Sequence, residues 1–368
     1  MIKYLGSKRT LLPDLLAAVA RLPQVRTVVD LFSGTSRVGQ ALKRSGRRVI
    51  ANDHNAYAHA LARCYVAADR DKVAREAERL LLELARLPGR PGYFTQTFCV
   101  EARYFQPKNG ERIDAIRDAI AAKSLDPLLE AVLLVSLMEA ADRVDSTVGV
   151  QMAYLKQWAP RAHHELELRL PDVLPAVEHG PCEAHCLDAL DAAATFEADA
   201  VYVDPPYNQH SYLSNYHIWE TLVRWDRPSH YGVARKREDC RTRKSAFNLR
   251  AQSQEAFRRV VQTARASFLI VSFNDEGFLA RDQIESILAQ RGEVFVLAKD
   301  FKRYVGAQIG IYNPQGEKVG KIGRLRNREH LYFVATERAA LDRPLAELLG
   351  DIAGASGGDR ARDSLALP

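Results

Sequence analysis

Two short runs of β-branched and apolar residues near the N-terminus, 27–32 and 48–53, are each followed by a segment with helical patterning, 34–44 and 55–67. Strands that alternate with helices are typical of a parallel sheet. We therefore predict an α/β fold with a doubly wound, Rossmann-like sheet. Further strand-like runs lie at 183–187, 200–203, 268–273, 294–298 and 330–335, with a hairpin-like unit at 308–322.

Helical patterns replace strands between residues 69 and 180. Apolar residues recur at helical spacing in 72–87, 110–123 and 126–144, and 158–175 is irregular. We predict that a mostly helical lobe, 69–180, is inserted into a sheet domain made of 1–68 and 181–340. The Gly- and Ser-containing tail, 354–368, is expected to be disordered.

Composition excludes several classes of protein. The chain has 368 residues, enough for one large domain with an inserted lobe. It has no apolar run long enough to span a bilayer and no signal-peptide pattern at its start, so we expect a cytoplasmic protein without a membrane partner. Its five cysteines are scattered and odd in number, which argues against a disulfide framework.

Basic charge is concentrated in two segments. Residues 224–259 contain eleven Lys and Arg against four Asp and Glu, and residues 299–328 contain eight against two. Such concentration is typical of proteins that bind a polyanion, although many charge runs are only solvated faces. The candidate phosphate-binding residues are Arg235, Lys236, Arg237, Arg241, Arg243, Lys244, Lys302 and Arg303.

The residues Asp204-Pro205-Pro206-Tyr207 follow the strand-like run 200–203. Each proline fixes φ and lacks an N–H group, so carbonyl oxygens there point outward. A planar heterocycle with an exocyclic amine fits this arrangement, because the amine can donate to Asp204 and to the Pro205 carbonyl while the ring stacks on Tyr207. The alternative is an ordinary proline-rich turn. We take Asp204, Pro205, Pro206 and Tyr207 as candidate catalytic residues.

A glycine loop, 34–39, follows the first strand and opens a helix. It resembles the dinucleotide fingerprint, but Ser36 replaces the glycine that allows a pyrophosphate to approach. Asp53 ends the second strand, where its carboxylate can accept hydrogen bonds from ribose hydroxyls. A nucleoside without a pyrophosphate in such a fold indicates S-adenosylmethionine.

Three residues near the N-terminus add to this pocket. Tyr4 can cover a sulfonium through a cation–π contact, Gly6 gives flexibility, and Lys8 can pair with the methionine carboxylate. The alternative is an arm that packs under the sheet with Lys8 solvated.

Together these motifs resemble the Dam-like DNA N6-adenine methyltransferases of the alpha-type motif order. The resemblance covers KYLGSK at 3–8, DLFSGTSRVG at 30–39, NDHN at 52–55, the DPPY segment at 204–222 and SFND at 272–275. It implies a methyltransferase catalytic domain in 1–68 and 181–340 and a target-recognition region in the helical insertion. The cofactor-binding residues that it implies are Tyr4, Gly6, Lys8, Asp30, Phe32, Gly34, Asp53, Asp188 and Asp204.

The expected activity is site-specific methylation of adenine N6 in double-stranded DNA. A cognate restriction endonuclease is a candidate partner, and the sequence leaves open whether the enzyme works with one or alone. The adenine must flip out of the duplex, and Tyr212, Tyr216 and Tyr304 are candidates for its second stacking face. Two alternatives stay open: the same chemistry on cytosine N4 or on a base in RNA, and a non-catalytic DNA-binding protein with this fold.

Two clusters are assigned no chemistry. His179, Cys182, His185 and Cys186 lack the usual zinc-ligand spacing, so no metal is expected. Glu139, Asp142 and Asp145 lie at the end of a predicted helix and are expected to form its solvated cap.

Overall fold

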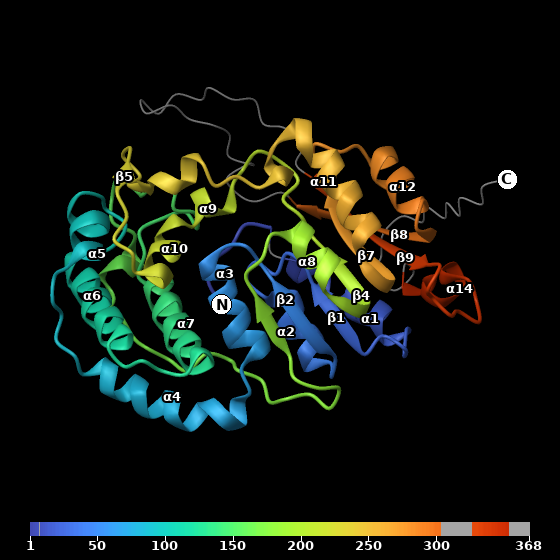
Figure 1. Ribbon diagram of the computed structural model, residues 1–368. Helices are drawn as coiled ribbons and strands as arrows, with labels where there is room; N and C mark the ends of the chain where they lie inside the picture. The colour runs from blue at the N-terminus through green and yellow to red at the C-terminus, as the bar shows by residue number, and fades with distance from the viewer. Residues whose placement is uncertain (7, 303–325, 353–368) are drawn as a thin grey trace.

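The computed structural model describes residues 1–6, 8–302 and 326–352, and its centre is a seven-stranded sheet (Figure 1). The strand order is β3-β2-β1-β4-β7-β9-β8. The first five strands in this order run parallel, and β9 pairs antiparallel with both β7 and β8. The strands are β1 Thr27–Asp30, β2 Arg48–Asn52, β3 Glu183–His185, β4 Glu197–Val203, β7 Arg265–Asn274, β8 Gly292–Lys302 and β9 Arg326–Thr336.

Helices cover both faces of the sheet, which confirms the predicted doubly wound fold. Val28 and Val29 alternate between the two apolar cores, since successive side chains of a strand point to opposite faces. One face is covered by α1 Leu12–Ala20, α2 Arg37–Arg44 and α14 Leu345–Leu349. The other is covered by α8 Ala189–Thr195, α11 Arg250–Thr263 and α12 Arg281–Ala289.

A helical lobe lies beside the sheet, on the left in Figure 1. It contains α4 Arg70–Ala85, α5 Tyr93–Thr95, α6 Pro107–Ala121 and α7 Pro127–Arg143. The start of α7 follows from its sequence: the Asp126 carboxylate accepts hydrogen bonds from the Leu128 and Leu129 amides, and proline occupies the first helical position.

The lobe shares its apolar core with elements outside the predicted insertion. Tyr57 on α3 Ala56–Ala62 and Trp219 on α10 His217–Arg224 are buried in the same cluster as Leu137 of α7. Between α7 and the sheet the chain is irregular apart from a 3₁₀ turn, Pro160–His163. The lobe and the sheet domain are therefore joined by a continuous core.

The acidic residues at the end of α7 are not a solvated cap, so that prediction is wrong. Asp142 and Asp145 are 8% and 3% exposed. The Lys3 ammonium lies 2.8 Å from Asp145 Oδ1, and the Lys3 amide donates to Asp142 Oδ2 at 3.1 Å. Arg161 also donates to Asp145, at 2.8 Å. Cations from two other segments offset the cost of burying these carboxylates, and they fix the N-terminal arm against α7.

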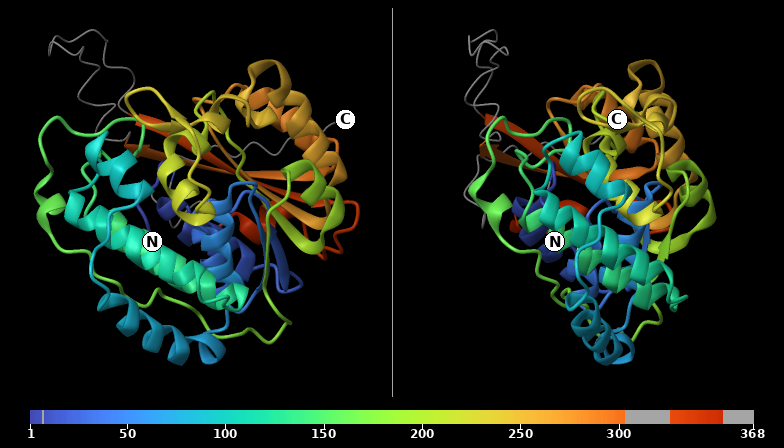
Figure 2. Two further views of the ribbon diagram at one scale, coloured as in Figure 1. Left: turned by 60° about the vertical axis from the view of Figure 1, so that its left-hand side comes forward. Right: turned by 90° about the vertical axis from the view of Figure 1, so that its left-hand side faces the viewer.

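Two further elements lie beside the lobe, the short helix α9 Tyr212–Asn215 and a hairpin of β5 His230–Tyr231 and β6 Lys236–Arg237 (Figures 1 and 2). Among the helices that the structure describes, none has the length and apolar character needed to cross a membrane. The predicted hairpin-like unit at 308–322, Arg303, Tyr304 and the tail at 354–368 lie outside the described residues.

Candidate active site

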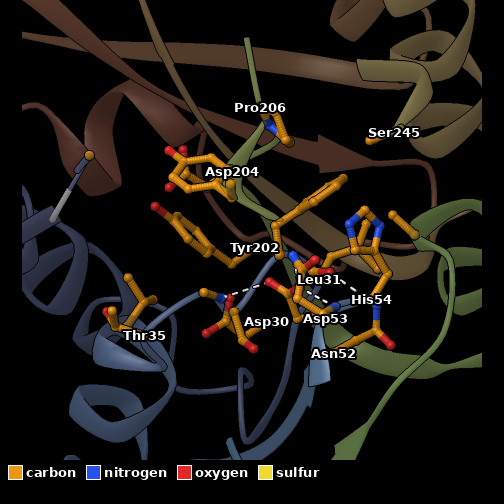
Figure 3. A pocket seen from close by; sticks show the side chains of 18 of the residues that line it. Asp30, Leu31, Thr35, Asn52, Asp53, His54, Tyr202, Asp204, Pro206 and Ser245 are labelled. Carbon is orange, nitrogen blue, oxygen red and sulfur yellow. Dashed lines mark hydrogen bonds between the residues drawn. The ribbon is translucent and has the colours of Figure 1, made fainter. Parts of the chain in front are cut away.

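A cavity opens at the carboxyl ends of β1, β2 and β4, the edge at which parallel α/β sheets bind ligands. It encloses about 940 Å³, counting its open mouth, which suits a nucleoside-sized ligand. Every predicted cofactor-binding residue lines it: Tyr4, Gly6, Lys8, Asp30, Phe32, Gly34, Asp53, Asp188 and Asp204. Figure 3 shows Asp30, Asp53 and Asp204 around this cavity, each coming from the end of a different strand.

The glycine loop is held against the sheet by Asp30. The Gly39 amide donates to Asp30 Oδ2 at 3.0 Å, and a Cβ atom at position 39 would lie 3.1 Å from the same oxygen. Burial raises the pKa of Asp30 to about 7, reinforced by the nearby charge of Asp204. Ser36 is fully buried in the left-handed conformation, φ 59°, which costs a residue other than glycine about 1–2 kcal/mol. At Ser36 the loop therefore has the left-handed backbone conformation that glycine favours, although serine stands there.

Asp53 organises the loops around the cavity. Its Oδ2 accepts from the Gly34 amide at 3.0 Å, and its Oδ1 accepts from the Asn55 amide at 2.9 Å and from the Asn55 side chain at 3.1 Å. A carboxylate has about four acceptor positions. The three protein donors therefore leave Asp53 with capacity for a ligand hydroxyl.

Tyr4 lies in a group of nearly parallel tyrosine rings. Its centroid is 4.5 Å from that of Tyr216 and 5.2 Å from that of Tyr212. Tyr216 is buried, and its hydroxyl oxygen accepts a hydrogen bond from the Leu5 amide of the N-terminal arm at 2.6 Å. Tyr212 lines the cavity, whereas Tyr304 lies outside the described residues. Of the two described candidates for the second stacking face, Tyr212 and Tyr216, it is Tyr212 that lines the cavity.

Lys8 is buried between two carboxylates. Its ammonium lies 3.1 Å from Asp204 Oδ1 and 3.2 Å from Glu329 Oε1. Burial alone would lower the pKa of Lys8, but Asp204 and Glu329 outweigh it and raise this pKa well above its ordinary value. The alternative in which Lys8 is solvated is therefore wrong. In this structure the positive charge of Lys8 is paired with the carboxylates of Asp204 and Glu329, so it does not depend on a ligand carboxylate for a partner.

The DPPY motif leaves β4 at the mouth of the cavity, where Asp204 and Pro206 line the wall (Figure 3). Burial raises the pKa of Asp204 to about 6, and Lys8 opposes that rise. Among the described residues, no hydrogen bond reaches the Pro205 carbonyl oxygen. The Tyr207 carbonyl accepts from the Phe278 amide at 2.8 Å, which fixes the turn. Asp204 thus supplies an acceptor side chain, and the next residue, Pro205, supplies a carbonyl oxygen that no hydrogen bond from a described residue reaches.

One of the predicted phosphate ligands is buried, which corrects its assignment, and a second one is held at the cavity by a glutamate. Arg237 is 2% exposed, and its guanidinium contacts both oxygens of Asp226 at 2.7 Å. Arg243 lines the cavity and contacts Glu220 Oε1 at 2.9 Å. The number of charged residues in 224–259 does not show which acidic residue faces each arginine, and Glu220 lies outside that segment, on α10.

Four of the other predicted phosphate ligands lie on the β5–β6 hairpin or follow it in the chain. Arg241 stacks over the Tyr231 ring, 3.9 Å from its centroid, and is 57% exposed. Arg235 lies 3.4 Å from Glu101, and Lys244 is exposed. Val233, at the turn of the hairpin, is 76% exposed. Lys236 belongs to β6 and Lys302 ends β8.

Two contributors to the site were not among the predicted catalytic or cofactor-binding residues. Glu329 lies on β9, far from Lys8 in the chain. The Asn248 side chain donates to the Asn208 and His210 carbonyls at 2.8 and 3.2 Å, which holds the loop after DPPY in place.

Across residues 1–6, 8–302 and 326–352, no group of three or more His, Cys, Asp or Glu is arranged to hold a metal ion.

Comparison with known proteins identifies related sequences. The family model described as "D12 class N6 adenine-specific DNA methyltransferase" matches residues 4–274. The Type II methyltransferase M.NlaIII of Neisseria lactamica is 29% identical over 318 residues, 82% of this chain and 92% of the relative. M.CviAII of Paramecium bursaria Chlorella virus 1 is 25% identical over 92% of this chain and 99% of the relative. M.FokI of Planomicrobium okeanokoites is 28% identical over 79% of this chain, which spans about half of that protein (47%).

Proposed function

Because the chain belongs to the D12 class N6 adenine-specific DNA methyltransferases, we propose that it transfers the methyl group of S-adenosylmethionine to N6 of an adenine flipped out of duplex DNA. The observation that carries this proposal is the position of Asp204 in the cavity wall, directly before a Pro205 carbonyl oxygen that no hydrogen bond from a described residue reaches.

The cavity fits S-adenosylmethionine on two grounds. All the residues that the motifs assign to the cofactor line it, and Asp30 Oδ1 and Ser33 Oγ are buried at its wall without a hydrogen-bond partner among the described residues. We assign the ribose hydroxyls to Asp53 and the adenine edge to Asp188. When bound, the cofactor supplies a methyl group on a sulfonium, which is a good leaving group.

Asp204 and Pro205 act on the target amine. The lone pair of adenine N6 is delocalised into the ring, so the amine is a weak nucleophile. Hydrogen bonds from N6 to the Asp204 carboxylate and the Pro205 carbonyl localise that pair and aim it into the cavity. Tyr207 stacks on one face of the base, and we assign the other face to Tyr212.

We assign DNA contacts to Arg235, Lys236, Arg241 and Lys244 around the β5–β6 hairpin, and target recognition to the lobe 69–180. Backbone contacts of this kind set affinity, whereas base contacts set specificity. Since several relatives are named Type II methyltransferases, we extend the proposal to a cognate restriction endonuclease with the same target.

Transfer of a tritiated methyl group to duplex DNA, single-stranded DNA and RNA, followed by nucleoside analysis, tests this function. We expect N6-methyladenine from duplex DNA. N4-methylcytosine, or labelled RNA, would select the same chemistry on another amine. Binding of DNA without transfer would select a non-catalytic protein.

A further inference from the structure

Glu329 is a buried carboxylate to which the proposed reaction gives no role. It belongs to β9 and pairs in register with Asn274 at the end of β7, which brings it to the carboxyl edge of the sheet. It is 7% exposed, and its Oε1 lies 3.2 Å from the Lys8 ammonium, which is itself 5% exposed. The family model ends at residue 274 and does not reach Glu329.

One ammonium therefore serves two carboxylates. Lys8 lies 3.1 Å from Asp204 Oδ1 on its other side, so Asp204, Lys8 and Glu329 together carry a net charge of −1 when both acids are ionised. Without Glu329, Lys8 and Asp204 would form a neutral pair. A carboxylate that is fully paired with an ammonium is a weaker acceptor for a third group.

We propose that Glu329 is a positioning residue for methyl transfer, which shares the charge of Lys8 and so keeps Asp204 available as the acceptor of the reacting amine. The inference rests on the proposed role of Asp204. It also gives Lys8 a task that does not depend on a ligand carboxylate, namely to hold Asp204 in place from the side opposite the base.

The reaction moves positive charge toward Asp204. The N6 lone pair forms the bond to the methyl carbon, and the electron pair of the breaking carbon–sulfur bond stays on sulfur. The methylated amine is then cationic, and one of its protons passes to the Asp204 carboxylate and on to solvent. A site with a net charge of −1 stabilises that cation, whereas a neutral Lys8–Asp204 pair does so less.

The pKa of Asp204 agrees with this arrangement. Burial raises it to about 6, Lys8 lowers it and Glu329 raises it. The nearby Ser272 hydroxyl also lowers this pKa. The other titratable groups that interact with Asp204 come from β1, β4 and the segment that follows β4: Asp30, Tyr202, Tyr207 and Tyr212.

Glu329→Gln tests the inference in single-turnover methyl transfer at saturating DNA and cofactor, measured from pH 5 to 9. The wild-type rate should fall as the pH drops through about 6, since Asp204 must be ionised. In the variant the rate at pH 8 should be about tenfold lower. The acid limb of the pH–rate profile, where the rate falls, should also move to lower pH in the variant. The reason is that the negative charge of Glu329, which raised the pKa of Asp204, is gone. A simple packing defect would lower the rate without moving this limb.

Glu285→Gln is the matched control, since this glutamate pairs with Arg281 on α12 outside the cavity, and its rate and limb should equal those of the wild type. An unchanged rate, or an unmoved limb, in Glu329→Gln would overturn the inference. If that variant does not fold, Glu329→Asp withdraws the carboxylate from Lys8, and its limb must move in the same direction by less. Absence of transfer in the wild type would instead refute the proposed function.

Discussion

The guanidinium of Arg243 donates a hydrogen bond to the backbone carbonyl oxygen of His54 at 3.1 Å. The same side chain contacts Glu220 of α10 at 2.9 Å, and Glu220 accepts from the Tyr57 amide at 3.1 Å. Arg243 thus ties the loop that follows β2 to α10. That loop carries Asp53, so a residue of the basic segment supports the cofactor side of the cavity.

Arg243→Lys should therefore weaken cofactor binding rather than DNA binding. Lysine keeps a positive charge beside Glu220 but loses the fork that also reaches His54. We expect the Kd for S-adenosylmethionine to rise roughly tenfold, about the effect of one charge-assisted hydrogen bond, with DNA affinity within twofold. Calorimetry and fluorescence anisotropy measure the two constants. Arg241→Lys, which changes an exposed arginine, is the control, and an unaltered cofactor Kd in Arg243→Lys would refute this assignment.

Asp204→Asn should abolish methyl transfer while DNA binding persists. The amide is isosteric but neutral, and it presents one acceptor where the carboxylate presents two. We expect a single-turnover rate lower by at least about 10²-fold, as for other lost groups that act on developing charge. DNA affinity should change little because phosphate contacts dominate it. Asp282→Asn, at an exposed position on α12, controls for the chemical change, and turnover close to that of the wild type in Asp204→Asn would contradict the proposed mechanism.

The fold and most of the cavity could be predicted from the sequence for a simple reason. Carboxyl ends of parallel strands meet at one edge of a sheet, so motifs that follow strands, such as those at Asp53 and Asp204, must converge once the strands are identified. Tyr4 and Lys8 precede the first strand, so the order of strands did not place them at this edge, and their assignment came from their residue types and from the motif resemblance.

The partners of charged residues could not be predicted in this way. Arg237 and Arg243 were counted with a basic surface, but Asp226 of the same segment and Glu220 of α10 hold their guanidinium groups. Asp145 was interpreted as solvated because its partners, Lys3 and Arg161, come from distant parts of the chain. Composition gives the number of charges, whereas side-chain direction depends on tertiary packing.

Asp145→Asn tests the anchor of the N-terminal arm. The change removes the negative charge from a carboxylate that faces both Lys3 and Arg161 at 2.8 Å and is 3% exposed. Breaking a buried pair in this way costs about 3–5 kcal/mol, so the free energy of unfolding in urea should fall by about that amount. Cofactor affinity should fall as well, because Tyr4 follows the anchored Lys3.

Glu167→Gln provides the comparison for this anchor. It breaks an ion pair with Arg169 in which both side chains are more than 60% exposed, and such pairs contribute at most about 1 kcal/mol. Equal losses of stability in the two variants would show that Asp145 does not anchor the arm.

The hairpin surface can be tested through the salt dependence of DNA binding. Each phosphate contact contributes about 0.9 to the slope of log Kd against log salt concentration. Replacing Lys236, Arg241 and Lys244 by glutamine should therefore lower the slope by about 2 to 3. The matched control replaces Arg21, Arg26 and Arg44, exposed residues close to the amino ends of β1 and β2, the edge of the sheet opposite the cavity. This control removes the same number of charges, so any effect of net charge alone would appear equally in both triple variants. If the two slopes change by the same amount, the hairpin does not contact DNA. If only the first slope falls, Lys236, Arg241 and Lys244 bind the phosphates, while Arg237 and Arg243 hold the segment in place through their acidic partners.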